Sequence, residues 1–86
     1  MKHKEWLGNR NLIEKLLKET GLYTADKSSS KRYAMKLIIW YVYVEIMSVE
    51  ETITKLWLDY GIELSYSKYY RLKARAILMM EKVLEK

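Results

Sequence analysis

The sequence contains no cysteine and a single histidine, His3, so it lacks most of the residues that build metal and catalytic sites. Without cysteine there is no disulfide, no thiolate metal ligand and no thiol nucleophile. One histidine in the N-terminal arm cannot supply the usual zinc ligand set or a serine–histidine catalytic pair. Glu50 and Glu51 are adjacent carboxylates, but electrostatics at a helix start explains them without catalysis. We therefore expect no enzymatic activity, no metal site and no cofactor.

Long hydrophobic runs are also absent. The longest run, 37–44, is far shorter than the roughly 20 residues that a membrane-crossing helix needs. Charged residues interrupt the first fifteen positions, so we expect no signal peptide and a cytoplasmic location. The 86 residues are 50% hydrophobic and 31% charged, which predicts one folded domain spanning residues 1–86.

Proline is absent and there are only three glycines, so the chain has few places to turn and the glycines mark them. Asn11 followed by Glu14 resembles a capping box and predicts a helix over 11–20. Gly21 then ends that helix in a left-handed conformation. The residues before it, around Trp6, form either a short helical turn or a loose arm.

The middle of the chain is apolar. After a polar loop over 24–31, a second helix should begin near 28–30, and the stretch 33–47 carries only Lys36 and Glu45 as charged residues. A helix without a polar side is buried on most sides. A strand is the alternative, because residues 38–44 are β-branched and aromatic. We favour a helix, since a lone strand would have no partner.

If this central helix is apolar all round, its short neighbours leave part of it uncovered, and an uncovered apolar patch indicates an interface. We therefore expect a homodimer. The candidate interface residues are Ile39, Trp40, Tyr43 and Met47. A two-fold dimer would also place two copies of a DNA-reading helix on one duplex.

The last part of the chain predicts two helices joined by a tight turn. Ser48 and Glu51 form a capping box in sequence, and Gly61 ends the helix that they start. Its apolar stripe is Val49, Ile53, Leu56, Trp57 and Tyr60. Ser65 can cap a further helix that continues to the C-terminus. These features predict an all-α, small four-helix domain with a C-terminal helix-turn-helix module over residues 48–80.

The last predicted helix has one apolar side and one basic side. At 100° per residue the apolar side holds Tyr69, Leu72, Ala76, Met79, Met80 and Val83, and the opposite side holds Lys68, Arg71, Arg75, Lys82 and Lys86. No acid occurs from Ser65 to Met80, whereas an ordinary surface helix mixes both signs. Groups able to bond bases or phosphates near its start are Ser65, Tyr66, Ser67, Lys68, Tyr70 and Arg71. This pattern favours binding to double-stranded DNA, and a merely solvated basic face is the alternative.

Aromatic residues include no phenylalanine, so tyrosine and tryptophan must fill the core, and we expect only Tyr66 and Tyr70 to face a partner. The net charge is +4 over residues 1–32, −3 over 33–64 and +4 over 65–86. Glu50 and Glu51 would repel phosphate at the start of the first module helix. Supporting contacts would then come from the arm with Lys2, Lys4 and Arg10 or from the loop residues Lys27, Lys31 and Arg32.

The stretch 64–76, Leu-Ser-Tyr-Ser-Lys-Tyr-Tyr-Arg-Leu-Lys-Ala-Arg-Ala, resembles the recognition helix of phage late transcription regulators of the ArpU and RinA type. That helix is similar in turn to the DNA-binding region four of sigma factors. The resemblance implies a DNA-binding regulator in which Ser65 caps the helix and Tyr69 packs inward. The DNA-facing residues that it implies are Lys68, Tyr70, Arg71, Lys73 and Arg75.

Two other functions fit the same sequence. One is a small interaction protein that binds a transcription factor, RNA polymerase or another protein through its aromatic-rich surface, with the basic side incidental. The acidic character of the predicted helix over 48–60 and the short chain favour this interpretation. The other is a small DNA-packaging subunit that uses the same module.

Overall fold

The computed structural model describes residues 2–85, and within that range every regular element is helical. In chain order these are the 3₁₀-helix η1 (Lys2–Trp6), α1 (Arg10–Thr20), α2 (Ser30–Ile39), the π-helix η2 (Trp40–Val44), α3 (Val49–Tyr60) and α4 (Tyr66–Leu84). The predicted all-α fold is confirmed, and the central stretch is a helix rather than a strand. None of the helices in this range is both long enough and apolar enough to cross a membrane.

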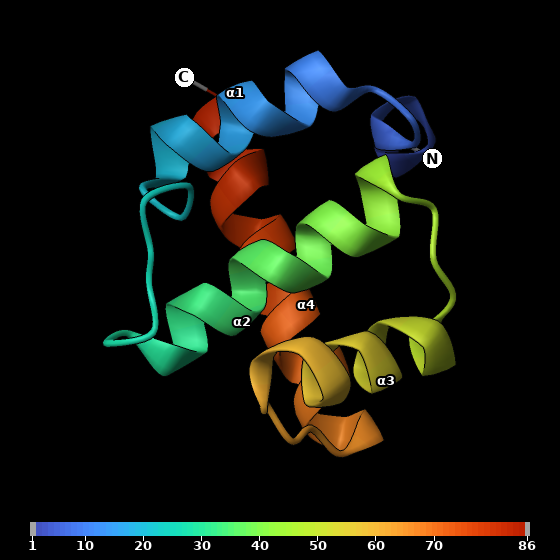
Figure 1. Cartoon of the computed structure of the whole chain (residues 1–86). Coiled ribbons are helices and arrows are strands. Elements are labelled where there is room, and N and C mark those ends of the chain that lie inside the picture. Colours follow the sequence, from blue (N-terminus) through green and yellow to red (C-terminus); the bar gives the residue numbers. More distant parts are fainter. Residues whose placement is uncertain (1, 86) are drawn as a thin grey trace.

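The most extensive contact between helices in the described residues is that of α4 with α2, and α4 also packs against α1. Figure 1 shows α4 passing behind α2 and ending beside α1, while α3 lies on the other side of α2, across the first turns of α4. The helix α2 with its extension η2 therefore touches all the other α-helices. This arrangement leaves one side of α4 and one side of α3 facing outward.

The core takes its aromatic bulk from tyrosine and tryptophan, as the lack of phenylalanine predicts. Trp6 is 2% exposed and its ring meets the ring of Tyr43 edge to face, with the centroids 5.5 Å apart. The inward side of α4 supplies Tyr69, Ala76 and Met80, all fully buried. Trp6 thus anchors η1 as a helical turn, and the loose arm is excluded as the conformation of that segment.

The start of α1 differs from the prediction, because the cap is Asn9 and not Asn11. The Asn9 side-chain oxygen accepts a hydrogen bond from the backbone N–H of Leu12 at 3.2 Å. Gly8 directs the chain into this cap: its φ is +73° and its N–H donates to the carbonyl of Tyr43 at 2.7 Å. This contact is long-range, so local spacing could not separate two asparagines that both suit a cap.

The central helix is also shorter than expected. It is α-helical only to Ile39, widens into the π-turns of η2 and ends at Val44. The mostly apolar stretch 33–47 from which it was predicted continues to Met47. The Tyr43 carbonyl accepts from Gly8, and Ile46 adopts a φ of +54°, which turns the chain away. The end of the helix meets α1 and α3, and the ring of Tyr43 contacts that of Trp6 in η1.

The proposed dimer surface on this helix is corrected by the burial pattern. Ile39 is 0% exposed and Tyr43 is 5% exposed within a single chain, so neither is available to a second copy. Trp40 and Met47 are half-buried. For Ile39 and Tyr43 the expectation is therefore wrong. Tyr43 is covered by Trp6 of η1, a segment whose conformation the sequence left undecided.

Candidate nucleic-acid interface

The helix-turn-helix geometry begins with the capping box of α3. The backbone N–H of Glu51 donates to Ser48 Oγ at 3.1 Å, and the Ser48 N–H donates to Glu51 Oε1 at 2.9 Å, as predicted. Hydrogen bonding to the Glu51 carboxylate from Ser48, first from its backbone N–H and then from its side chain, holds the pKa of Glu51 below its usual value because it favours the charged form. The carboxylate is therefore negative at neutral pH at the very start of α3.

The turn between α3 and α4 depends on a glycine and a serine. Gly61 has φ +66°, and its N–H donates to the carbonyls of Leu56 and Trp57, which closes α3 as predicted. Ser65 Oγ then accepts from the backbone N–H of Lys68 at 3.2 Å and starts α4. The Ser65 hydroxyl is thus engaged in the cap, which makes it a structural residue of this site.

The first turns of α4 separate a buried side from an exposed one. Tyr69 is fully buried, and burial raises its pKa to about 12, so the phenol stays neutral. Tyr66 is 54% and Tyr70 53% exposed. The polar and basic residues between and after them, Ser67, Lys68, Arg71 and Arg75, are exposed as well.

Lys73 differs from the other cationic candidates in its burial and in the side of α4 on which it lies. It is half-buried, and its ammonium lies 6.0 Å from the ring centroid of Tyr43, which belongs to η2. At 100° per residue Lys73 is about 200° around the helix from Arg75 and lies on the side of Tyr66 and Tyr70. The predicted site residues therefore form two flanks: a cationic flank with Lys68, Arg71 and Arg75, and a flank with Tyr66, Tyr70 and Lys73.

The cationic flank of α4 continues onto the start of α2. A hollow of about 430 Å³ between the two helices is lined by Lys31 and Arg32 from α2 and by Arg75 and Lys82 from α4. A smaller hollow of about 60 Å³ next to it is lined by Lys31 and Lys68. We call this surface the basic face and define it by Lys31, Arg32, Lys68, Arg71, Arg75 and Lys82. Lys86, which the helical wheel also places here, lies outside the described residues.

No acid neutralises the basic face within residues 2–85: none of its six cations has an ion pair there. Glu81, the first acid after the acid-free stretch, lies instead 2.7 Å from His3 through their side-chain atoms. Arg32 also donates to the Thr20 carbonyl at 3.5 Å. The positive charges are therefore free to meet an anionic partner.

Of the two predicted sources of supporting cations, the predicted loop supplies Lys31 and Arg32, which the structure places in the first turn of α2. The N-terminal arm points elsewhere: the Arg10 guanidinium lies 5.3 Å from the ring centroid of Trp40, beside α1 and η2. The side chain of Lys2 lies outside the described part of the structure. The basic face thus unites residues more than thirty positions apart, a grouping that sequence spacing could not reveal.

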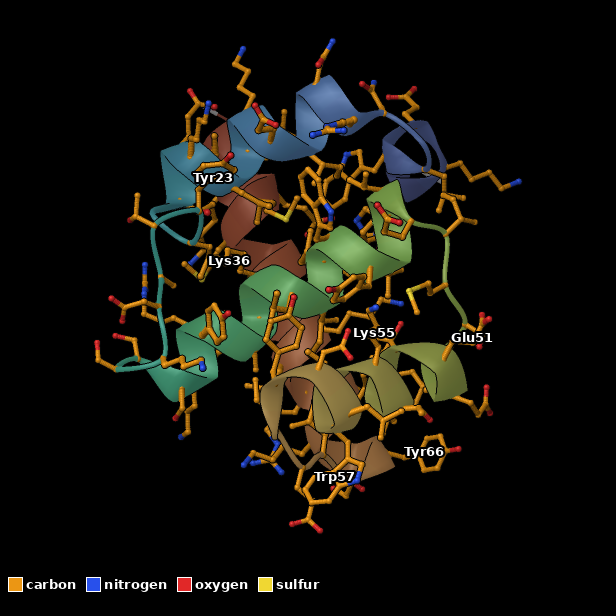
Figure 2. The ribbon with its side chains drawn as sticks, in the orientation of Figure 1. Tyr23, Lys36, Glu51, Lys55, Trp57 and Tyr66 are labelled. Carbon is orange, nitrogen blue, oxygen red and sulfur yellow. The ribbon has the colours of Figure 1, made fainter. Side chains whose placement is uncertain are left out.

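The outward side of α3 was missed at the sequence level. Trp57, expected in the apolar stripe, is 53% exposed, and Leu58 is 71% exposed, while Thr52 is fully buried in its place. Thr52 donates to the Ser48 carbonyl at 2.8 Å, which satisfies its hydroxyl. Figure 2 shows Trp57 pointing away from α2, and Tyr66 pointing outward from the start of α4. Thr52 lies four residues before Leu56 on the same helix side, and this spacing was the available signal.

Comparison with known proteins identifies no relative for this site. No protein-family model, curated protein or solved structure matches the chain.

Proposed function

We propose that this protein binds double-stranded DNA, with the exposed side of α4 in the major groove and the basic face on the phosphates beside it. The observation that carries the proposal is the position of Lys31 and Arg32 next to Arg75 and Lys82. Cations from two helices then line one hollow and extend along α4 to Lys68. Such a surface supplies the phosphate contacts that dominate DNA affinity.

The most outward line of α4 suits close approach to a groove. Opposite the buried Tyr69 and Ala76, the helical wheel places Ser67, Arg71 and Ala74, all of them exposed. Ser67 and Ala74 are small, and Arg71 lies between them with a guanidinium that can bond a guanine edge in a bidentate manner. This line is the part of the site with the chemistry to distinguish base sequences.

The biological role that fits this chemistry is control of transcription. A helix-turn-helix that contacts bases through one helix and phosphates through its neighbours binds particular DNA sites. The likeness of residues 64–76 to the recognition helix of phage late regulators adds the expectation of a phage or mobile-element regulator. We therefore propose a regulator that binds duplex DNA directly.

A salt series with matched alanine variants tests the proposal. The affinity for mixed-sequence duplex DNA should fall steeply between 50 and 200 mM salt, by about 10³-fold if all six cations of the basic face contact phosphates. Lys31→Ala should weaken binding and reduce the slope of log affinity against log salt by about 0.9. Lys31 is the informative position because it belongs to α2 and lies beside the cations of α4 only through the packing of the two helices.

The control is Lys15→Ala, which removes the same charge from the exposed side of α1. It should leave the slope unchanged. No binding at the lowest salt concentration, or equal losses in the two variants, would contradict the proposal and favour a protein-interaction role without DNA binding.

A further inference from the structure

A second surface lies on α3 and is acidic and apolar. It centres on a hollow of about 360 Å³ that is lined by Met47, Glu50, Glu51, Thr54, Lys55 and Leu58. We call it the α3 face and define it by those six residues. On the helical wheel Leu58 is in line with Thr54 and Glu50, and it is the most exposed of the large apolar side chains, at 71%. This surface is separate from the basic face.

The charge around the α3 face is negative almost throughout. Residues 45–63 contain five acids and one lysine. That lysine, Lys55, is already paired with Asp59 at 2.7 Å, and the pair raises the pKa of Lys55. Figure 2 shows Glu51 at the start of α3, on the same side of the view as Tyr66. A partner on this face must therefore bring positive charge of its own.

Apolar side chains give the face its anchoring points. Besides Leu58, the neighbouring Trp57 is 53% exposed and Ile46, which precedes Met47, is 56% exposed. Ile46 has φ +54°, a conformation that β-branched residues rarely adopt, and it holds an apolar side chain outward. Exposed tryptophan and leucine beside uncompensated acids are typical of a binding surface.

The geometry favours a helical partner. Residues 2–85 offer no strand edge, so a bound peptide cannot add to a sheet and must be recognised through side chains. The 12 residues of α3 span about 18 Å, which matches three turns of a second helix lying along it. From these observations we propose that the α3 face binds a basic amphipathic helix of a partner protein, with the partner's leucines on Leu58 and Met47 and its lysines or arginines near Glu50 and Glu51.

A symmetric second copy is the less suitable occupant. In a two-fold pairing of α3 helices the acids of one copy would face the acids of the other, since the only lysine of the stretch is engaged by Asp59. Like charges opposed in an interface weaken binding. The proposal does not depend on DNA binding, because the two surfaces share no residue.

The test uses a designed 14-residue helical peptide with leucines on one side and lysines on the other, added to the full chain and followed by NMR. Resonances of α3 should shift, whereas those of α1 should not. Leu58→Ser should weaken binding by about tenfold, because a leucine is a typical anchor. Glu50→Lys should weaken it by about two- to fivefold.

Matched controls distinguish the α3 face from the rest of the surface. Leu7→Ser changes another leucine that is 49% exposed, and Glu19→Lys makes the same charge change on α1. Neither substitution should alter binding of the peptide. A peptide with glutamates in place of its lysines should not bind. Equal effects of Leu58→Ser and Leu7→Ser would overturn the proposal. A dimer in sedimentation that Leu58→Ser abolishes would also overturn it, because the occupant would then be a second copy.

Discussion

The turn of the helix-turn-helix can be tested through Gly61, whose φ of +66° lies in the left-handed region. A Cβ at this position would meet no atom within 4 Å, so Gly61→Ala introduces backbone strain and no clash. Left-handed backbone costs an alanine about 1–2 kcal/mol, and the smaller entropy of the unfolded alanine chain offsets about 0.4–1 kcal/mol. The net loss of unfolding free energy should be about 1 kcal/mol.

Thermal unfolding followed by circular dichroism measures this loss. For a domain of this size 1 kcal/mol lowers the melting temperature by about 4–8 °C. Gly61→Asn is the control, because asparagine adopts left-handed backbone more readily, and it should recover most of the loss. An alanine variant as stable as the parent, or an asparagine variant as unstable as the alanine one, would refute the reasoning. Either result would mean that backbone conformation at the turn does not limit stability.

Four further substitutions test the site, the core and the start of α3. Lys73→Ala should leave the salt slope of DNA binding unchanged while Arg75→Ala lowers it by about 0.9, because the two side chains lie on opposite flanks of α4. Ile39→Ala should lower the unfolding free energy by about 2–5 kcal/mol at every protein concentration. A loss that depends on protein concentration would instead indicate that Ile39 lies in an interface between two copies. Glu51→Gln should destabilise the protein at neutral pH by removing the charged partner of Ser48. The pKa of Glu51 is lower in the folded protein than in the unfolded chain, so the stabilisation by its carboxylate is lost as the pH falls through the folded-state pKa. The difference in unfolding free energy between the parent and Glu51→Gln, measured by urea titration, should therefore shrink as the pH falls below the usual glutamate pKa.

Local signals were sufficient wherever one segment decides the structure. The capping box at Ser48, the cap at Ser65 and the terminators at Gly21 and Gly61 involve residues within a few positions of one another, and all are confirmed. The inward position of Tyr69 follows from helical periodicity in the same way. Such features depend on backbone geometry that neighbouring residues impose.

Long-range contacts account for the failures. The Gly8 bond to Tyr43 set the start of α1 and the end of η2, and it joins positions 35 residues apart. The burial of Tyr43 depends on Trp6 of η1, a segment whose conformation the sequence left open. The exposure of Trp57 followed from the side of α3 that meets α2, which hydrophobic spacing alone left ambiguous because aromatic residues fit either side.

The charge of Glu50 should have opposite effects on the two proposed interactions. When α4 lies on a duplex, the carboxylate of Glu50 at the start of α3 belongs to the same helix-turn-helix and repels phosphate. At the α3 face the same carboxylate attracts a basic helix. Glu50→Lys should therefore strengthen DNA binding and weaken binding of the lysine–leucine peptide.

A general change of net charge would act differently. Glu19→Lys adds the same two charges on α1, so it should raise DNA affinity only slightly and leave the peptide unaffected. Parallel titrations of each variant with duplex DNA and with the peptide measure both affinities at one salt concentration. If Glu50→Lys moved the two affinities in the same direction, the charge of Glu50 could not act oppositely on the two partners. The separation of positive charge on α2 and α4 from negative charge on α3 would then not determine which surface binds DNA and which binds a basic helix.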